Sequence, residues 1–255
     1  MKLSVVTVCL NARDTIADAV ESVHRQTYPN VEHIVVDGGS DDGTVEILQQ
    51  YKHRIARLIS ERDEGLYFAM NKGIEAATGE YVGFLNSDDV YHSEYALQSV
   101  ANAVADSRPD AVHSDLVYVD RHDPSRVIRY WHSKPYVKGM FEAGWHPAHP
   151  TLFVKTQLLR SVGGFDTRYR YHADFDLMVR LFVARKISSV YVPGVMVRMR
   201  AGGQSTRSLS NVYKGNRESW EIARRFGVAR TPLWMVRKLG YRVGQFFHRP
   251  TAGAR

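Results

Sequence analysis

Apolar and polar residues alternate along the first hundred residues with two different periods. Short β-branched runs predict strands at 3–10, 31–37, 55–60 and 80–85. The segments between them place apolar residues on one helical face, as Ile16, Ala19, Val20 and Val23 do, and predict helices at 14–26, 44–51 and 67–77. Strands that alternate with helices in this way are typical of a sheet with crossover helices, so the expected fold class is α/β.

The second half of the chain has a less regular pattern. The predicted elements are a strand at 111–119, a short extended segment at 147–154, a helix at 173–184, a strand pair at 190–199 interrupted at Pro193-Gly194, and helices at 211–226 and 233–247. No internal repeat is present, and no linker is long enough to separate two independent domains. The chain is therefore expected to form one α/β body with a helical extension at its C-terminus.

Polar residues follow three of the predicted strands directly. Asn11 follows the first strand, Asp37 closes the second, and Asp88 lies just beyond the fourth. Open α/β sheets bind ligands in the crevice outside the carboxyl ends of their strands. We therefore expect these three side chains to converge on one ligand.

Several classes of nucleotide and metal site are excluded. The chain has no G-x-x-x-x-G-K-[ST] motif, and Asn11-Ala12-Arg13 follows the first strand where a dehydrogenase would have G-x-G-x-x-G. A nucleotidyltransferase would need a Gly-rich loop with Arg or Lys at the same place. The single cysteine, Cys9, and the spacing of the histidines do not support a zinc site.

The segment Asn86-Ser87-Asp88-Asp89 is the first candidate for chemistry. It follows the apolar run 81–85, so its carboxylates leave the end of a buried strand. Mg²⁺ and Mn²⁺ are held by one or two carboxylates together with substrate phosphates, so one Asp here is sufficient when the ligand is a diphosphate. The alternative is that these residues only cap a helix that starts near Ser93.

A second candidate lies at the start of the helix predicted at 173–184. Asp174 and Asp176 are two residues apart and cannot share a helical face, so we expect different roles for them. One would point at the ligand as a base, while the other caps the helix or pairs with Arg180, four residues after Asp176. A lone Asp at a helix start is more often a cap, so this motif alone does not indicate an enzyme.

Taken in order, the motifs resemble those of a known family. They are VVTVCLNA at 5–12, VVDGGSDDGT at 35–44, DEGLY at 63–67, MNKG at 70–73, ATGEY at 77–81 and FLNSDD at 84–89, followed by HPTLF at 149–153, GGFD at 163–166, ADFDL at 173–177 and GGQS at 202–205. The chain is similar to family 2 glycosyltransferases of the GT-A fold, in particular bacterial enzymes of exopolysaccharide, O-antigen and glycolipid assembly of the colanic-acid type. The resemblance covers residues 1–227 and implies a Rossmann-like mixed sheet flanked by helices.

The resemblance implies roles for individual residues. A nucleotide-sugar half, 1–110, would bind a nucleoside-diphosphate sugar, and an acceptor half, 111–227, would bind a glycan or a polyprenyl-linked or other lipid-linked acceptor. The implied donor-binding residues are Val8, Leu10, Asn11, Asp37, Gly38, Asp63, Asn71 and Ser87. Asp88 would bind Mg²⁺ or Mn²⁺, Asp174 would deprotonate the acceptor hydroxyl, and His149 and Asp176 would contact the acceptor. The implied reaction is a single in-line displacement that inverts the anomeric carbon.

Some positions depart from the family pattern. Asn86 replaces the first acid of the D-x-D motif, and Gly38 stands where many relatives have a second acid that meets the base, so uridine specificity does not follow. The Q-x-x-R-W motif of processive synthases is missing, which favours transfer of a single sugar. A catalytically silent nucleotide-sugar-binding or scaffold protein of the same fold is the alternative.

Charge is distributed unevenly along the chain. Residues 198–255 carry 13 basic and 2 acidic side chains, a net charge of +11, whereas the rest of the chain has 21 basic and 25 acidic side chains, a net charge of −4. We expect residues 228–255 to form a basic amphipathic tail in which Trp234, Phe246 and Phe247 face an anionic membrane surface.

Composition and charge also bear on location. The acidic body and the lack of a recognition motif argue against nucleic acid as a partner. No apolar run is long enough to span a bilayer, no signal peptide is expected, and a single cysteine fits a reducing compartment. The expected location is the cytoplasm, peripheral to the inner face of the plasma membrane.

Overall fold

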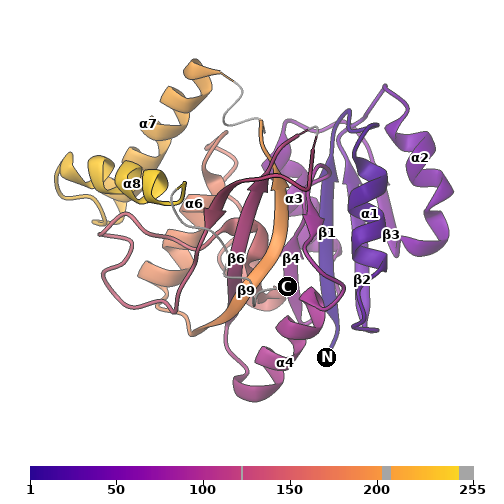
Figure 1. Ribbon diagram of the computed structural model, residues 1–255, viewed down its shortest axis with the longest axis horizontal. Helices are drawn as coiled ribbons and strands as arrows, with labels where there is room; N and C mark the ends of the chain where they lie inside the picture. The colour runs from indigo at the N-terminus through magenta and orange to yellow at the C-terminus, as the bar shows by residue number, and fades with distance from the viewer. Residues whose placement is uncertain (122, 203–207, 247–255) are drawn as a thin grey trace.

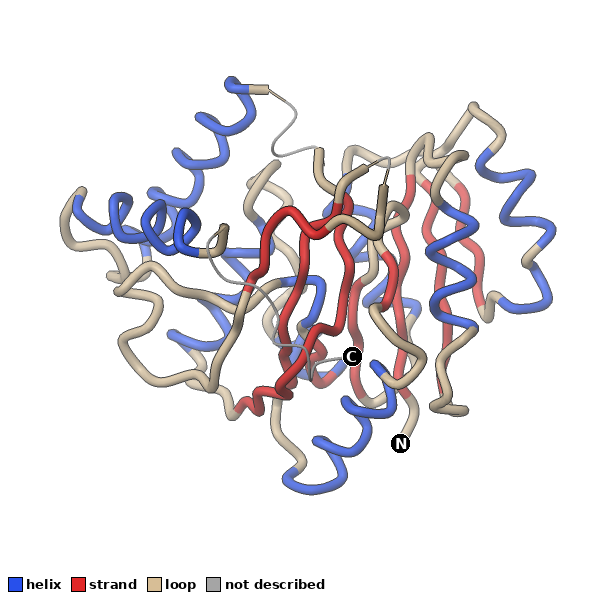
Figure 2. The backbone as a smooth tube through the Cα atoms, viewed as in Figure 1, coloured by secondary structure: helices blue, strands red, loops and turns tan. Residues whose placement is uncertain are grey.

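The computed structural model describes residues 1–121, 123–202 and 208–246. Within these residues nine strands form one mixed sheet in the order β3-β2-β1-β4-β8-β6-β9-β5, with β7 paired to β6 (Figures 1 and 2). The strands are β1 Leu3–Cys9, β2 Val31–Asp37, β3 Arg57–Ser60, β4 Tyr81–Phe84, β5 Val90–Tyr91, β6 Ala111–Val119, β7 Val127–Trp131, β8 Phe153–Lys155 and β9 Ser189–Arg200. The predicted mixed α/β sheet is confirmed.

Helices cover both faces of this sheet. They are α1 Ile16–His24, α2 Thr44–Gln50, α3 Leu66–Ala76, α4 Ala96–Ser107, α5 Thr156–Ser161, α6 Ala173–Met178, α7 Leu209–Arg225 and α8 Leu233–Gly244, with short 3-10 turns at Lys52–Arg54 and His149–Thr151. Because side chains alternate along a strand, Leu3 and Val5 of β1 pack on the face covered by α4, whereas Val6 and Val8 pack against α3. The result is a three-layer arrangement in which the central strands β1 and β4 are buried on both faces.

The first four strands are parallel, and the sheet changes direction at β8. β1 pairs in parallel with β2 and β4, and Cys9 lies opposite Asp37, so the carboxyl ends of these strands share one edge. β8 then runs antiparallel to both β4 and β6, while β6 and β9 are parallel. In the first half of the chain, residues 1–85, the observed strands and helices begin and end within two residues of the predicted positions.

The second half differs from the prediction in three places. Residues 190–199 belong to the single strand β9 rather than to a strand pair, because β9 follows β6 through a register shift beside Pro193 and Gly194. The segment 147–154 is a 3-10 turn followed by β8, and the helix at 173–184 is confirmed but becomes a π-helix over Val179–Ala184. Strands β5 and β7 and helix α5 were not predicted.

The C-terminal helix packs on the body of the protein (Figure 1). Trp234 is only 3% exposed, and its indole N–H donates to the carbonyl of Phe141 at 2.8 Å. A Cβ atom at Gly144 would lie 2.7 Å from the backbone nitrogen of Lys238, so the two backbones are in direct contact. The expectation that Trp234 faces a membrane is therefore wrong, and Phe247 lies outside the described residues. Among the described helices, none combines the length and apolar character needed to cross a membrane.

Candidate active site

A cleft of about 1120 Å³ opens at the carboxyl ends of β1 and β4. It extends from the β1–α1 connection to β7 and α8, so both halves of the chain contribute to its walls. Most of the predicted site residues line it: Val8, Leu10, Asn11, Gly38, Asp63, Ser87, Asp88, His149 and Asp174. Asp37, Asn71 and Asp176 do not. The predicted convergence of Asn11 and Asp88 is confirmed, whereas that of Asp37 is not.

The connection after β1 is held in shape by its own hydrogen bonds. Asn11 has a φ of 52°, and its backbone N–H donates to Ser40 Oγ at 2.8 Å. Its side-chain oxygen accepts from the N–H of Asp41 at 3.1 Å. This locks the β1 and β2 connections together and presents the backbone of Leu10 and Asn11 to the cleft.

Asp63 lies beside Gly38 and keeps one oxygen available. A Cβ atom at Gly38 would lie 3.3 Å from both carboxylate oxygens of Asp63, so a larger residue would displace this carboxylate. Asp63 Oδ1 accepts from the N–H of Gly65 at 3.0 Å, while its buried Oδ2 has no partner among the described residues. Because Asp63 lines the cleft, this oxygen is a free acceptor for a ligand hydroxyl or N–H group.

Asp37 supports the loop rather than the ligand. It is fully buried, and its carboxylate accepts hydrogen bonds from Gly39 N, Ser40 N, Ser40 Oγ and Ser60 Oγ. Burial raises the pKa of Asp37, but the hydrogen bonds from Ser40 and Ser60 outweigh it and leave the pKa below its ordinary value. The prediction that Asp37 contacts the nucleoside is therefore corrected, since its oxygens are already used.

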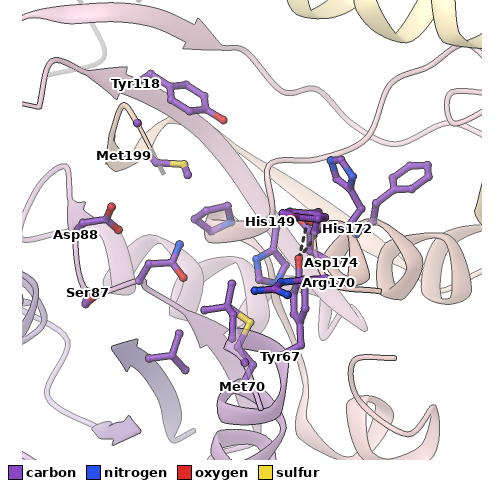
Figure 3. Close-up of a pocket in the computed structure, with 18 of the residues that line it drawn as sticks. Tyr67, Met70, Ser87, Asp88, Tyr118, His149, Arg170, His172, Asp174 and Met199 are labelled. Atoms are coloured by element: carbon purple, nitrogen blue, oxygen red, sulfur yellow. Dashed lines mark hydrogen bonds between the residues drawn. The ribbon is translucent and has the colours of Figure 1, made fainter. Parts of the chain in front are cut away.

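The Asn86–Asp89 turn places one carboxylate in the cleft and buries the other. No helix starts at this turn, since it leads into β5 and α4 begins only at Ala96, so the capping alternative is wrong. Asp89 is fully buried and accepts from Asn86 Nδ2 at 3.1 Å and from the N–H of Arg200 at 3.2 Å. Asp88 lines the cleft beside Ser87 (Figure 3), and burial raises its pKa.

The oxygens at this turn suit a hard cation. Asn86 Oδ1 is buried without a hydrogen-bond partner among the described residues, and Asn86 lines the cleft together with Asp88. Among the residues that the structure describes, no group of three His, Cys, Asp or Glu side chains is arranged to hold a metal ion by itself. One carboxylate and one amide oxygen match a Mg²⁺ or Mn²⁺ ion that takes its remaining ligands from a diphosphate and water.

Asp174 lies across the cleft from Asp88 (Figure 3). Its Oδ1 accepts from the N–H of Phe175 at 2.8 Å and from the hydroxyl of Tyr67 at 3.3 Å. Burial raises the pKa of Asp174, but the positive charge that neighbouring histidines, His149 first among them, carry when they are protonated outweighs burial, so the pKa lies below its ordinary value. Asp174 is thus a carboxylate at neutral pH.

Two other predicted residues brace the wall behind Asp174. Asp176 is fully buried and accepts from Arg180 Nε at 2.7 Å, which confirms the predicted pair and leaves Asp176 out of the cleft. Asn71 exchanges two hydrogen bonds with the backbone of Phe165, at 2.8 and 2.9 Å. The predictions of an acceptor contact for Asp176 and a donor contact for Asn71 are corrected, because both side chains hold the 163–165 turn.

His149 lies in the cleft wall as predicted. It is 8% exposed, and its ring centroid lies 5.5 Å from those of both Phe84 and Phe165. Burial lowers the pKa of His149, so its imidazole is neutral at pH 7. A neutral ring beside Asp174 can donate or accept one hydrogen bond to a ligand hydroxyl.

Sequence reasoning missed the cations on the acceptor side of the cleft. Arg129 of β7 and Lys238 and Arg242 of α8 all line it. Strand β7 was not predicted, and the two α8 residues were assigned to a membrane-facing surface. One available signal was the spacing of Lys238 and Arg242, because residues four apart on a helix share a face. Of the GGQS motif at 202–205, residues 203–205 lie outside the described residues.

Comparison with known proteins identifies relatives of this chain. Residues 4–159 match the family described as Glycosyl transferase family 2. A PGL/p-HBAD biosynthesis glycosyltransferase of Mycobacterium tuberculosis is 32% identical over 182 residues, which cover 70% of this chain and 69% of that protein.

Two solved structures share the fold at low sequence identity. TarS 1–349 of S. aureus, in complex with UDP-GlcNAc, superposes with a TM-score of 0.66 and 17% identity over 96% of this chain and 73% of that one. The same fragment with UDP gives a match that spans 65% of its length. The mannosyltransferase PcManGT of Pyrobaculum calidifontis, in complex with GDP-Man and Mn²⁺, superposes with a TM-score of 0.65 and 18% identity over 99% of this chain and 77% of that one. The predicted GT-A fold is thereby confirmed.

Proposed function

Because the chain belongs to glycosyltransferase family 2, we propose that it is an inverting, metal-dependent enzyme that moves one sugar from a nucleoside-diphosphate sugar to a hydroxyl group. The observation that carries this proposal is the placement of Asp88 and Asp174 on opposite sides of one cleft. The acceptor would be a glycan or a lipid-linked glycan of the cell surface, as the name of the mycobacterial relative suggests.

The donor would occupy the wall built by residues 1–110. Asp63 Oδ2 and the backbone at Leu10 and Asn11 would bind the nucleoside, and Ser87 would bind the ribose. Asp88 and Asn86 Oδ1 would hold Mg²⁺ or Mn²⁺ against the diphosphate, and PcManGT, which was solved with GDP-Man and Mn²⁺, supports this assignment. When bound, the cation would neutralise charge that develops on the departing diphosphate.

The acceptor would occupy the wall built by residues 111–227, extended by α8. Asp174 would take the proton of the acceptor hydroxyl, whose oxygen forms a bond to the anomeric carbon as the bond to the diphosphate breaks on the opposite face. Asp174 Oδ1 already accepts hydrogen bonds from the Tyr67 hydroxyl and the N–H of Phe175, so we assign Oδ2 as the atom that takes the proton of the acceptor hydroxyl. Its low pKa keeps Asp174 ionised, and a general base of this kind typically contributes 10²–10⁴-fold to the rate.

The location that suits this activity is the inner face of the plasma membrane. Helix α8 exposes a row of apolar side chains with Arg237 between them: Leu233, Val236, Leu239, Val243 and Phe246. An apolar row flanked by cations is suited to an anionic bilayer surface. Co-sedimentation with anionic vesicles should fall in a Val236→Asp/Val243→Asp double variant and stay unchanged in Tyr95→Asp, which alters an exposed apolar residue elsewhere. Equal binding by all three proteins would contradict membrane docking by α8.

The donor site can be tested by thermal shift. UDP-, GDP- and dTDP-sugars would be compared with Mn²⁺, Mg²⁺ or EDTA on the wild type and on Asp88→Ala, with Asp106→Ala on the exposed face of α4 as the matched control. We expect one nucleotide series to raise the Tm in the presence of metal, and this rise to disappear in Asp88→Ala and with EDTA. If no nucleotide stabilises the protein with any metal, the proposed function is wrong. Binding without hydrolysis or transfer would favour the catalytically silent alternative.

A further inference from the structure

The acceptor side of the cleft ends in a cluster of three cations, Arg129, Lys238 and Arg242. Their position relative to the donor site follows from the sheet register. Met199 of β9 pairs with Tyr118 of β6, which pairs in turn with Arg129 of β7. Two strand spacings separate Met199 from Arg129, roughly 10 Å. Met199 is the member of this row that lies beside Asp88 in Figure 3, so the backbone of Arg129 lies two strands away from the proposed diphosphate position, with its side chain over Tyr118 of the strand between them.

Arg129 is a buried cation whose hydrogen-bonding capacity is largely unused. Its side chain lies 3.7 Å above the ring of Tyr118, and the residue is 7% exposed. The buried Nε and Nη2 atoms have no hydrogen-bond partner, and no acidic group forms an ion pair with Arg129, among the residues that the structure describes. Burial and the nearby Arg242 both lower its pKa. An unpaired buried guanidinium is costly, so one that lines a cleft is suited to an anionic ligand that enters the cleft.

The two cations of α8 add to this positive charge. Lys238 and Arg242 are four residues apart, and burial followed by the charge of Arg242 lowers the pKa of Lys238 to about 8, although Asp174 opposes this shift. The Lys238 ammonium donates to Ser219 Oγ at 2.5 Å and lies 4.9 Å from the ring centroid of Phe175, so it is anchored in place. Three cations that meet in one cleft match a group that carries more than one negative charge.

We propose that Arg129, Lys238 and Arg242 bind a phosphate group of the acceptor. This inference rests on the proposed function and adds the chemical class of its substrate, a sugar linked to a phosphate. The sugar hydroxyl would lie at Asp174, and the phosphate would lie against the guanidinium of Arg129. Phe246, whose ring centroid is 5.7 Å from Arg129, is 53% exposed, and a lipid attached to the phosphate would leave the cleft along it.

Titration calorimetry in saturating nucleoside diphosphate and Mn²⁺ tests the proposal, because the donor site is then filled. The probes are farnesyl phosphate, glucose 1-phosphate, inorganic phosphate and farnesol. We expect farnesyl phosphate to bind at least about 10-fold more tightly than farnesol. In Arg129→Gln and Arg242→Gln its Kd should rise about 10- to 100-fold. Arg185→Gln, an exposed neutralisation outside the cleft, should bind as the wild type does.

The other outcomes are informative in different ways. Tighter binding of farnesyl phosphate than of glucose 1-phosphate would assign the phosphate to a lipid, and the reverse would assign it to a sugar phosphate. The proposal would be overturned if the phosphate probe that binds more tightly bound equally well to the wild type and to both Arg129→Gln and Arg242→Gln, or if no phosphate probe bound more tightly than farnesol. Arg129→Gln loses the contact of the guanidinium with the Tyr118 ring, so its folding is checked by the Tm, whereas Arg242 is exposed and Arg242→Gln is expected to remain folded. Nucleotide binding without phosphate binding would leave the proposed function intact, whereas loss of both would remove it.

Discussion

The two walls of the cleft are constructed in different ways. On the donor side, hydrogen bonds near neighbouring strand ends fix the polar groups. The N–H of Ser40 donates to the Asp37 carboxylate, and the N–H of Asp41 donates to Asn11 Oδ1. On the acceptor side, β7, α6 and α8 come together from distant parts of the chain. Buried polar atoms without a partner among the described residues occur on both walls: Asp63 Oδ2 and Asn86 Oδ1 on the donor side, and Arg129 Nε and Trp145 Nε1 on the acceptor side. Those of the donor side are acceptor oxygens, whereas those of the acceptor side include the donors of a buried cation.

This difference indicates which wall needs its ligand more. The hydrogen bonds between strand ends keep the donor wall in shape when the cleft is empty, whereas a buried cation without an ion pair is paid for in stability until an anionic ligand satisfies it. The donor wall is therefore expected to be preorganised, and the acceptor wall to gain most from substrate. Substitutions on the two sides should consequently separate into effects on folding and effects on turnover or acceptor binding.

The largest effect is expected at Asp174, which the acceptor wall contributes to the reaction. Asp174→Asn removes the base but keeps the acceptor for the bonds from Phe175 and Tyr67, so kcat should fall about 10²–10⁴-fold. The affinity for the donor nucleotide should stay within about threefold of wild type, since the donor wall is intact. Steady-state kinetics and nucleotide titrations measure both, with Asp106→Asn as control. A parallel loss of nucleotide affinity would show that the two walls are not separable.

A folding effect of intermediate size is expected in the donor half of the chain, residues 1–110, at Glu32 near the start of β2. This carboxylate accepts from Lys2 Nζ, Ser4 Oγ, Thr78 N and Thr78 Oγ1 at 2.5–3.1 Å. Burial raises the pKa of Glu32, but these bonds outweigh it and lower the pKa to about 2. A carboxyl with a depressed pKa stabilises the fold above its unfolded pKa, near 4.5, and this contribution is lost as the pH falls through 2.

Glu32→Gln should therefore lower the free energy of unfolding at pH 7 by about 2–3 kcal/mol, and the wild type and the variant should converge as the pH approaches 2. Urea denaturation at several pH values measures this difference. Glu46→Gln, in the first turn of α2, is the control, and should change the free energy of unfolding by no more than about 0.5 kcal/mol. A constant difference from pH 7 to pH 3 and below would mean that the charge of Glu32 does not stabilise the donor side.

The difference between the two walls of the cleft also explains which site residues could be predicted from the sequence. Local strand–turn motifs specify the donor wall, so Asn11, Asp63, Ser87 and Asp88 were placed in the cleft correctly. The motif match could not distinguish a residue that contacts a ligand from one that supports the loop, which explains the correction at Asp37.

The acceptor wall depends on contacts between distant segments. Arg129 lies in a strand that forms only by pairing with β6, and α8 reads as a free amphipathic helix until Trp234 is placed in the core. Local periodicity carries no information about such packing. The residues missed by sequence reasoning are accordingly those whose position is set by tertiary contacts.

The smallest effect concerns the pH dependence of the acceptor wall. With a pKa of about 8, Lys238 loses its proton within an accessible range, so the KM for a phosphate-bearing acceptor should rise several-fold between pH 7 and pH 9. Arginine keeps its charge at these pH values, so Lys238→Arg should flatten the profile, while kcat and donor KM follow the same pH course in both proteins. Acceptor KM measured across this range tests the assignment. If Lys238→Arg retains the wild-type rise, the titrating group lies elsewhere, and Lys238 only anchors α8 through Ser219.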